Sequence, residues 1–184
     1  MGYLIEEQYK GHTYIVDYDE CRMNPREEYD NLGTIYANRR DLNFDHTTIL
    51  DLVEQGLLTN ESHPKPTRKF KRDYICRLVY YYEHGGIALS LGSFGCPFDS
   101  GVAAWIAVPK SKVRREYGCK RVTKKIEERV VRAFKGEIEE LQAYINGDVY
   151  FWCVDNEDAC GGYLDPQEAE DEAKALIDRL VNND

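Results

Sequence analysis

The sequence predicts an α+β fold in which one antiparallel sheet of about five to six strands is covered by a long amphipathic helix and a C-terminal helix. This class is favoured because strand patterns come in runs, whereas helical periodicity collects late in the chain. A doubly wound fold is disfavoured, since neither a G-x-G-x-x-G nor a Walker sequence is present. The length of 184 residues suits a single domain, with an exposed basic linker around residues 60–73.

The first third of the chain predicts short elements. Residues 12–16 and 33–38 are typical of strands and lie on either side of a polar, turn-rich stretch. Apolar residues then recur with helical spacing between Ile49 and Leu57. Pro64 and Pro66 belong to the linker that follows, which we expect to be a mobile, exposed loop.

From Tyr74 onward the pattern indicates β structure, because Gly85 and Gly86 predict a two-residue hairpin turn. The register set by this turn pairs His84 with Ile87, Tyr82 with Leu89 and Tyr80 with Leu91. Tyr81 then falls on the opposite face, where it either packs under a helix or stays exposed and stacks on bases. Residues 102–108 are apolar on both faces, which predicts a central strand.

The last third predicts three helices and one more strand pair. Residues 109–117 are typical of a short basic helix closed by Gly118, and Thr123 caps a long amphipathic helix. Residues 149–154 form a strand with 161–164 as its hairpin partner. Asp165, as an N-cap, opens the C-terminal helix. The apolar stripes of the two long helices consist of Ile126, Val130, Phe134, Ile138, Leu141 and Ile145, and of Ala169, Ala173, Leu176 and Leu180.

Charge is segregated along the chain. Residues 65–72 and 110–125 hold 13 of the 24 basic residues and one acid, Glu116, which leaves a formal charge of −21 on the other 160 residues. An acidic body repels phosphate backbones and favours cationic partners. The two basic islands either balance acidic neighbours as solvated surface or contact nucleic acid, through Lys69, Lys71, Arg114 and Arg115.

Neither a metal nor a cofactor is expected. The six cysteines contain no C-x-x-C pair, and the four histidines lack metal-ligand spacing. We expect the cysteines to be reduced, and only Cys153 and Cys160, on either side of a short turn, to approach each other. Carboxylates between Asp17 and Asp30 are dense enough to hold magnesium or calcium, yet EF-hand spacing is absent. The alternative is a structural turn in which Arg26 forks onto a nearby carboxylate.

The glycine-rich connection of residues 92–101 presents Cys96. As a nucleophile Cys96 needs a base, for which His84 is nearest in the sequence, and Pro97 removes an amide that an oxyanion hole often uses. The structural alternative is a rigid loop whose Asp99 accepts backbone hydrogen bonds. We favour the structural alternative, because a buried cysteine is the commoner occurrence.

Two stretches resemble a known family: residues 24–34, N-P-R-E-E-Y-D-N-L-G-T, and residues 95–101, G-C-P-F-D-S-G. The chain resembles a family of small acidic proteins that phages and other mobile elements carry, and residues 147–150 and 158–161 extend the match. Phe98 stands where the family pattern has tryptophan, and Glu28-Tyr29 adds a residue before Asp30. The resemblance implies a genomic context and no catalytic residues. It makes Arg26, Asp30, Asn31, Cys96 and Asp99 the motif positions to examine.

Small acidic proteins of such elements are often antagonists of host defence, of the anti-CRISPR type. The leading hypothesis is therefore a phage protein that inhibits a host nuclease, a CRISPR effector or a restriction enzyme, by binding without catalysis. Its acidic contacts would be Glu139, Glu140, Glu168, Asp171 and Glu172. The alternatives are a metal- or cysteine-dependent hydrolase and an accessory protein that binds nucleic acid through the basic islands.

The hypothesis also sets expectations about partners and location. We expect a protein partner, at most weak binding of free nucleic acid, no membrane association and a homodimer as one option. The longest apolar run, residues 102–108, is too short for a membrane span, and the N-terminal residues do not read as a signal peptide. A cytoplasmic protein is therefore expected.

Overall fold

The computed structural model describes residues 2–183 and confirms the α+β class. The chain divides into two compact units: unit 1 joins residues up to Asn24 with those from Ala143 onward, and unit 2 is Pro25–Gln142. The prediction of a single sheet is wrong, because the described strands form two sheets, of four and five strands. Sequence periodicity finds strands but not partners that lie more than 130 residues apart, as in the first sheet. That the chain forms a single domain stays a prediction.

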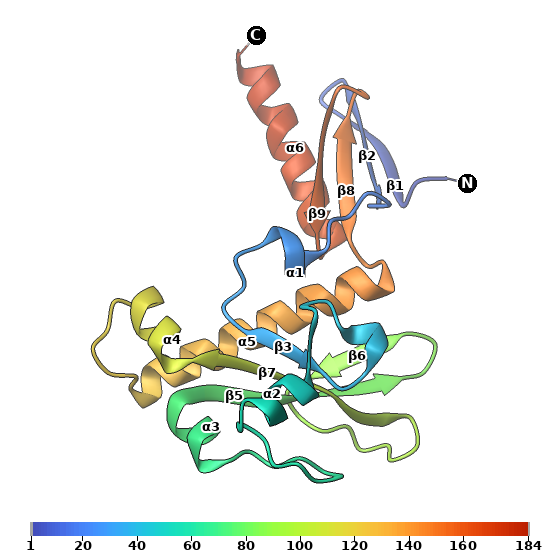
Figure 1. The fold of residues 1–184 in the computed structure, drawn as a ribbon. Coiled ribbons are helices and arrows are strands. Elements are labelled where there is room, and N and C mark those ends of the chain that lie inside the picture. Colours follow the sequence, from blue (N-terminus) through green and yellow to red (C-terminus); the bar gives the residue numbers. More distant parts are fainter. Residues whose placement is uncertain (1, 184) are drawn as a thin grey trace. The chain divides into compact units, whose positions relative to one another are not determined.

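Unit 1 is a two-layer structure of one antiparallel sheet and one helix, drawn in blue and orange-red in Figure 1. Its strands, in the order β1-β2-β8-β9, are β1 (Ile5–Tyr9), β2 (His12–Tyr18), β8 (Tyr150–Val154) and β9 (Asp158–Tyr163). The helix α6 (Pro166–Asn183) packs against β2, β8 and β9. Tyr14, Val16, Trp152 and Val154 meet Ala169, Ala173 and Ile177 of α6 in a buried core. Small alanines let the helix approach the sheet closely.

The sheet of unit 2 has the order β4-β3-β7-β5-β6. Its strands are β3 (Thr34–Ala37), β4 (Thr47–Thr48), β5 (Tyr74–Glu83), β6 (Ile87–Ser90) and β7 (Ser100–Pro109). The central position of β7 is confirmed, and its residues 103–108 are all buried. All pairs are antiparallel except β3 with β4.

Helices lie on both faces of this sheet (Figure 1). They are α1 (Pro25–Glu28), the 3₁₀-helix η1 (Arg40–Leu42), α2 (Ile49–Glu54), α3 (Arg68–Asp73), α4 (Lys110–Glu116) and α5 (Lys124–Asn146). Leu52 of α2 and Phe70 of α3 pack on the Trp105 face of β7. Phe134 of α5 covers the other face, where it approaches Gly33 beside Ile106. Val130, Phe134, Ile138 and Leu141 are buried, which confirms most of the predicted stripe.

Two local predictions are wrong. The hairpin loop has three residues, 84–86, because Glu83 pairs with Ile87 and Tyr81 with Leu89; the amide of His84 donates to the carbonyl of Gly86 and closes the loop. The linker of residues 60–73 is not one mobile loop. Thr67 caps α3 by accepting from the amide of Phe70, and Leu58 bridges to Pro66. Tyr81 lies under the guanidinium of Arg39, 4.4 Å from its ring centre.

Cys153 and Cys160 do not face each other, because Cys153 pairs with Ala159 and Cys160 with Trp152. Side chains of adjacent residues point to opposite faces of a sheet, so the two thiols lie on opposite faces. No helix within residues 2–183 combines the length and the apolar character that a membrane crossing needs.

Candidate nucleic-acid interface

The two basic islands of the sequence meet at one end of the unit 2 sheet. Strands β5 and β7 pair Tyr74 with Pro109, so α3, which precedes β5, and α4, which follows β7, are attached to the same end (Figure 1). The Lys110 ammonium donates to the carbonyls of Lys71 at 3.1 Å and Arg72 at 2.9 Å. One side chain thus joins the second island to the first.

The N-terminus of α5 lies at the same end. Arg77 of β5 pairs with Glu127 in the first turn of α5 at 3.1 Å. The Cys76 thiol of β5 interacts electrostatically with the charges of four neighbours, Arg77, Lys110, Lys71 and Glu127. Burial raises the pKa of this thiol despite three nearby cations, so it is kept as a neutral thiol beneath the charged layer.

Buried anchors hold the cationic helices in place. Phe70 of α3 is fully buried, with its ring 5.3 Å from Tyr74 and 5.8 Å from Trp105. Val113 anchors α4 in the same way, and Gly118 ends that helix with a φ of 59°, a left-handed conformation that glycine adopts freely. Thr123 caps α5 by accepting from the amide of Ile126. The charged side chains around these anchors are therefore carried on fixed backbone.

We call the exposed cations of the two islands, residues 65–72 and 110–125, the basic surface. Four acids lie among or beside these cations. Asp73, which is half-buried, pairs with Arg72 at 2.7 Å, Glu116 pairs with Arg115 at 3.1 Å, and Glu127 pairs with Arg77 at 3.1 Å. Glu128, four residues after Lys124 on α5, is exposed. The bond from Arg72 lowers the pKa of Asp73, so both groups stay charged. The basic surface consists of Lys65, Arg68, Lys69, Lys71, Arg72, Arg114, Arg115, Lys120, Arg121, Lys124 and Lys125.

The four predicted contact residues of the islands all belong to this surface, but only two of their side chains are engaged in other contacts. Lys69 donates to the carbonyl of Gln55 at 3.0 Å, and Arg115 is paired with Glu116. Lys71 and Arg114 are exposed, and within residues 2–183 their side chains make no hydrogen bond or ion pair. Lys71 and Arg114 are thus the most available for a ligand.

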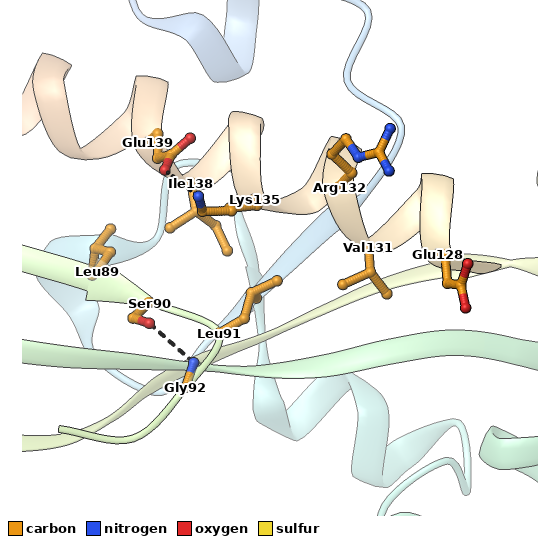
Figure 2. A pocket seen from close by; sticks show the side chains of 10 residues that line it. All are labelled: Leu89, Ser90, Leu91, Gly92, Glu128, Val131, Arg132, Lys135, Ile138 and Glu139. Carbon is orange, nitrogen blue, oxygen red and sulfur yellow. Dashed lines mark hydrogen bonds and ion pairs between the residues drawn. The ribbon is translucent and has the colours of Figure 1, made fainter. Parts of the chain in front are cut away.

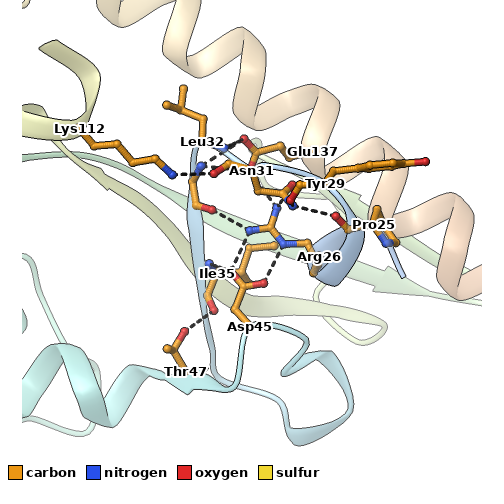
Figure 3. Close-up of polar contacts among 11 residues, drawn as sticks. Pro25, Arg26, Tyr29, Asn31, Leu32, Ile35, Asp45, Thr47, Lys112 and Glu137 are labelled. Carbon is orange, nitrogen blue, oxygen red and sulfur yellow. Dashed lines mark hydrogen bonds and ion pairs between the residues drawn. The ribbon is translucent and has the colours of Figure 1, made fainter. Parts of the chain in front are cut away.

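Arg26 is the centre of a buried ionic cluster in unit 2 (Figure 3). Its side chain, 1% exposed, forks onto Asp45 at 2.7 and 2.8 Å and bonds Glu137 at 2.9 Å. It also donates to the side chain of Asn31 and the carbonyl of Gly33. The structure thus agrees with the structural interpretation of this motif, in which Arg26 forks onto a carboxylate. Asp30 is exposed and lies outside the contacts of this cluster.

Two members of this cluster, Asp45 and Glu137, escaped the sequence analysis. They lie 19 and 111 residues from Arg26 in the chain. Glu137 also accepts from the amides of Leu32 and Gly33, so it holds the motif backbone against α5. The one available signal was its position between Phe134 and Ile138, at the border of an apolar stripe where a lone carboxylate needs a partner.

Within residues 2–183, the Cys96 thiol has an acceptor but no hydrogen bond to an imidazole. Its thiol donates to the Asp99 carboxylate at 3.5 Å, and Ser100 donates to the Cys96 carbonyl. His84, the base considered from the sequence, stacks on Tyr82 instead, with ring centres 6.3 Å apart. Asp99 accepts from the amide of Glu83 through its main-chain carbonyl, not its side chain. The loop is braced at its base and exposes 93% of Phe98 at its tip.

The predicted acidic contacts are divided between the units. Glu168, Asp171 and Glu172 are exposed on α6 of unit 1. In unit 2, Glu139 pairs with Lys135, whereas burial raises the pKa of the half-buried Glu140. Among the described residues no group of histidine, cysteine, aspartate or glutamate side chains has the arrangement of a metal site.

Unit 2 also has an open groove of about 390 Å³ between α5 and β6 (Figure 2). Leu89, Leu91, Val131 and Ile138 form its apolar floor, and the charged side chains of α5 stand at its rim. The chain matches no protein-family model, no curated protein and no solved structure.

Proposed function

We propose that this protein binds nucleic acid through the basic surface of unit 2. The observation that carries the proposal is the double hydrogen bond of Lys110, which joins two islands that the sequence keeps 38 residues apart. Eleven exposed cations outnumber the four acids beside them, three of which are paired with arginines, so this surface attracts phosphates. Phosphate contacts supply most of the affinity of non-specific nucleic-acid binding. Nucleic-acid binding, an alternative in the sequence analysis, is thus preferred here to inhibition of a host nuclease, which was the leading hypothesis.

The net charge of the chain does not oppose this proposal, because charge acts locally. Exposed charges are largely screened beyond a Debye length of about 8 Å at physiological salt. Unit 2 has 20 basic and 17 acidic residues, a formal charge of +3, while the acid excess belongs to unit 1. A phosphate at the basic surface therefore meets mainly cations.

A gel-shift titration tests the proposal. Replacing Lys69, Lys71, Arg114 and Arg115 by glutamine should weaken binding of DNA or RNA by about 100-fold or more at low salt. The matched control replaces Arg132 and Lys135, exposed cations of α5 that lie about 10 Å or more along the helix from Lys125. The control should bind as the unchanged protein does. Equal weakening in both variants, or no shift by the unchanged protein at low salt, would overturn the proposal.

The inhibitor hypothesis remains a second proposal, supported by unit 1. That unit has 16 acidic and 4 basic residues, a formal charge of −12, and α6 exposes three carboxylates within its first two turns. An acidic surface of this kind competes for a channel that otherwise holds nucleic acid.

In a cleavage assay with a CRISPR effector or a restriction enzyme, this second proposal expects inhibition that is lost on changing Glu168, Asp171 and Glu172 to lysine. The control reverses Glu54 and Glu61, exposed acids of unit 2. Inhibition that disappears instead in the quadruple basic-surface variant, or under excess substrate, means that the protein sequesters nucleic acid. That result would refute inhibition through α6 and support the first proposal.

A further inference from the structure

We infer that the ligand of the basic surface is a nucleic-acid duplex held through its phosphates, not a single strand. This inference rests on the proposed function and specifies its substrate class. Its first basis is the position of the aromatic side chains. Proteins that hold single strands offer aromatic faces on which successive unpaired bases stack.

The aromatic residues of the two basic segments and of their junction with β5 are buried or half-buried, and none of them presents a freely exposed ring. Phe70 is fully buried, and Tyr74 packs against it. Tyr117 is half-buried beneath the guanidinium of Arg129, 4.8 Å from its ring centre. The one almost fully exposed aromatic of unit 2, Phe98, precedes β7, whereas the basic surface lies where β7 ends. A strand of ten residues spans about 30 Å, so Phe98 stands far from the cations.

The second basis is the chemistry of the polar side chains. Residues 65–73 and 110–125 contain no asparagine or glutamine, the side chains that read adenine edges in pairs of hydrogen bonds. Thr67 and Thr123 are engaged as helix caps. Apart from Ser111, which is exposed, the remaining polar side chains there are mainly lysines and arginines. These contact phosphates without regard to sequence, and the only base edge that they commonly read is that of guanine. The surface is therefore suited to the backbone of nucleic acid more than to its bases.

The third basis is rigidity. Lys71 and Arg114 are carried by short helices that Phe70 and Val113 anchor in the core and that Lys110 joins. Cations whose backbone is held in place favour a ligand whose phosphates are also fixed. A duplex has a persistence length of about 150 base pairs and a charge about every 1.7 Å along its axis, whereas a single strand must first be ordered.

Fluorescence polarisation with the full chain tests this inference. The probes are a labelled 20-base-pair DNA duplex, the RNA duplex of the same sequence, and the single strand of each. We expect at least one duplex to bind about 10-fold more tightly than its own single strand, and a duplex of scrambled sequence to bind equally within about 3-fold. Single strands that bind as tightly as both duplexes, or a strong preference for one duplex sequence, would overturn the inference but leave the proposed function standing. Absence of binding to every probe at low salt would overturn the proposed function itself.

A salt titration identifies the contacts. For a duplex, the slope of log K against log salt is about −0.9 for each phosphate contact, so changing Lys71 and Arg114 to glutamine should reduce its magnitude by about 1.8. Both side chains are exposed, so the fold should be unchanged in circular dichroism. The Arg132 and Lys135 double variant serves as the control and should keep the slope. An unchanged slope in the Lys71 and Arg114 variant would refute phosphate binding at this surface.

Discussion

Units 1 and 2 both pack a sheet against helices, but they carry opposite formal charges of −12 and +3. In unit 1 the acids are spread over the strands, turns and α6. In unit 2 the bases gather where α3, α4 and the start of α5 meet, while most acids lie elsewhere. The whole-chain charge of −9 is the sum of these two opposite charges and describes neither unit. Partners should therefore be inferred from each unit separately.

The units differ as well in where their ionic contacts lie. Unit 2 buries a guanidinium, Arg26, between two carboxylates. Unit 1 places its cluster at the rim of its core, where the Lys174 ammonium, 34% exposed, pairs with Glu170. The Tyr14 hydroxyl lies 3.0 Å from a Glu7 oxygen and 2.8 Å from a Glu170 oxygen and donates to one of them at a time. Removing one member of a buried pair leaves an unpaired buried charge, whereas water replaces a lost partner at a rim. We expect unit 2 to be the more sensitive of the two to loss of a single ionic contact.

The two tryptophans of the chain allow this comparison to be measured. Trp105 lies in the core of unit 2 and Trp152 in the core of unit 1. Replacing either one by phenylalanine leaves a single tryptophan, whose fluorescence reports the unfolding of its own unit. Unfolding of each unit is therefore followed in the variant that keeps the tryptophan of that unit.

The largest effect is expected at Arg26. Changing Arg26 to leucine leaves Asp45 and Glu137, each 10% exposed, without their cation. The free energy of unfolding should fall by about 3–5 kcal/mol in a urea titration that follows Trp105. The same change at Arg39, whose side chain is 24% exposed and pairs with Asp41 and Glu83, should cost about 1 kcal/mol or less. Similar losses in the two variants would contradict a buried role for Arg26.

The next effect tests how closely the motif backbone approaches the core. A Cβ atom on Gly33 would lie 2.7 Å from Ile106 and 2.8 Å from Phe134, so changing Gly33 to alanine should cost about 1–3 kcal/mol. Gly136, inside α5, has open space at the same position, and its change to alanine should stabilise by about 0.5–1 kcal/mol. Trp105 should report opposite shifts of the urea midpoint. Shifts of the same sign would mean that the Gly33 site relaxes.

The sequence predicted the elements better than their partners. Periodicity located the central strand 102–108, the helix that Thr123 caps and the helix that Asp165 opens, because these signals are local. It could not show that β2 pairs with β8, since that contact joins the two ends of the chain. For that reason one sheet was predicted where two exist.

Prediction of the candidate site was limited in the same way. The two basic islands were visible as runs of lysine and arginine, but their meeting depends on the pairing of β5 with β7 and on Lys110. Pro64 and Pro66 dominate the pattern of residues 60–73, which therefore predicts a mobile loop. The buried Phe70 and the Thr67 cap fold its second half into α3. Burial of the Phe70 ring therefore stabilises a helix that the local sequence pattern does not predict.

A pH-dependent effect is expected in unit 1. The Lys174 ammonium and the Tyr14 hydroxyl lower the pKa of Glu170, while burial and the Glu170 bond raise the pKa of Tyr14 to about 12. A depressed carboxyl pKa adds stability above its unfolded pKa of about 4.3, and this stability is lost as the pH falls through the folded pKa. Changing Glu170 to glutamine should cost about 1 kcal/mol at pH 7, measured by Trp152, and less as the pH falls from 5 to 3.

The control for this change is Asp171 to asparagine, on the exposed face of α6, which should alter stability by less than about 0.5 kcal/mol. A cost at Glu170 that stays constant from pH 7 to pH 3 would mean that its packing matters and its charge does not.

The smallest effect is expected at Cys96. The thiol is half-buried and donates one long hydrogen bond, of 3.5 Å, to Asp99, which a serine hydroxyl can replace. Changing Cys96 to serine should alter the free energy of unfolding by about 0.5 kcal/mol or less, compared with the roughly 1 kcal/mol expected of a fully buried cysteine. Duplex binding and any inhibition of a nuclease should stay within a few-fold of the unchanged protein, because Cys96 precedes β7 and the basic surface lies where β7 ends. Loss of a biological activity with unchanged stability and unchanged duplex binding would instead identify a nucleophile, and the loop of residues 92–101 would then be the site to pursue.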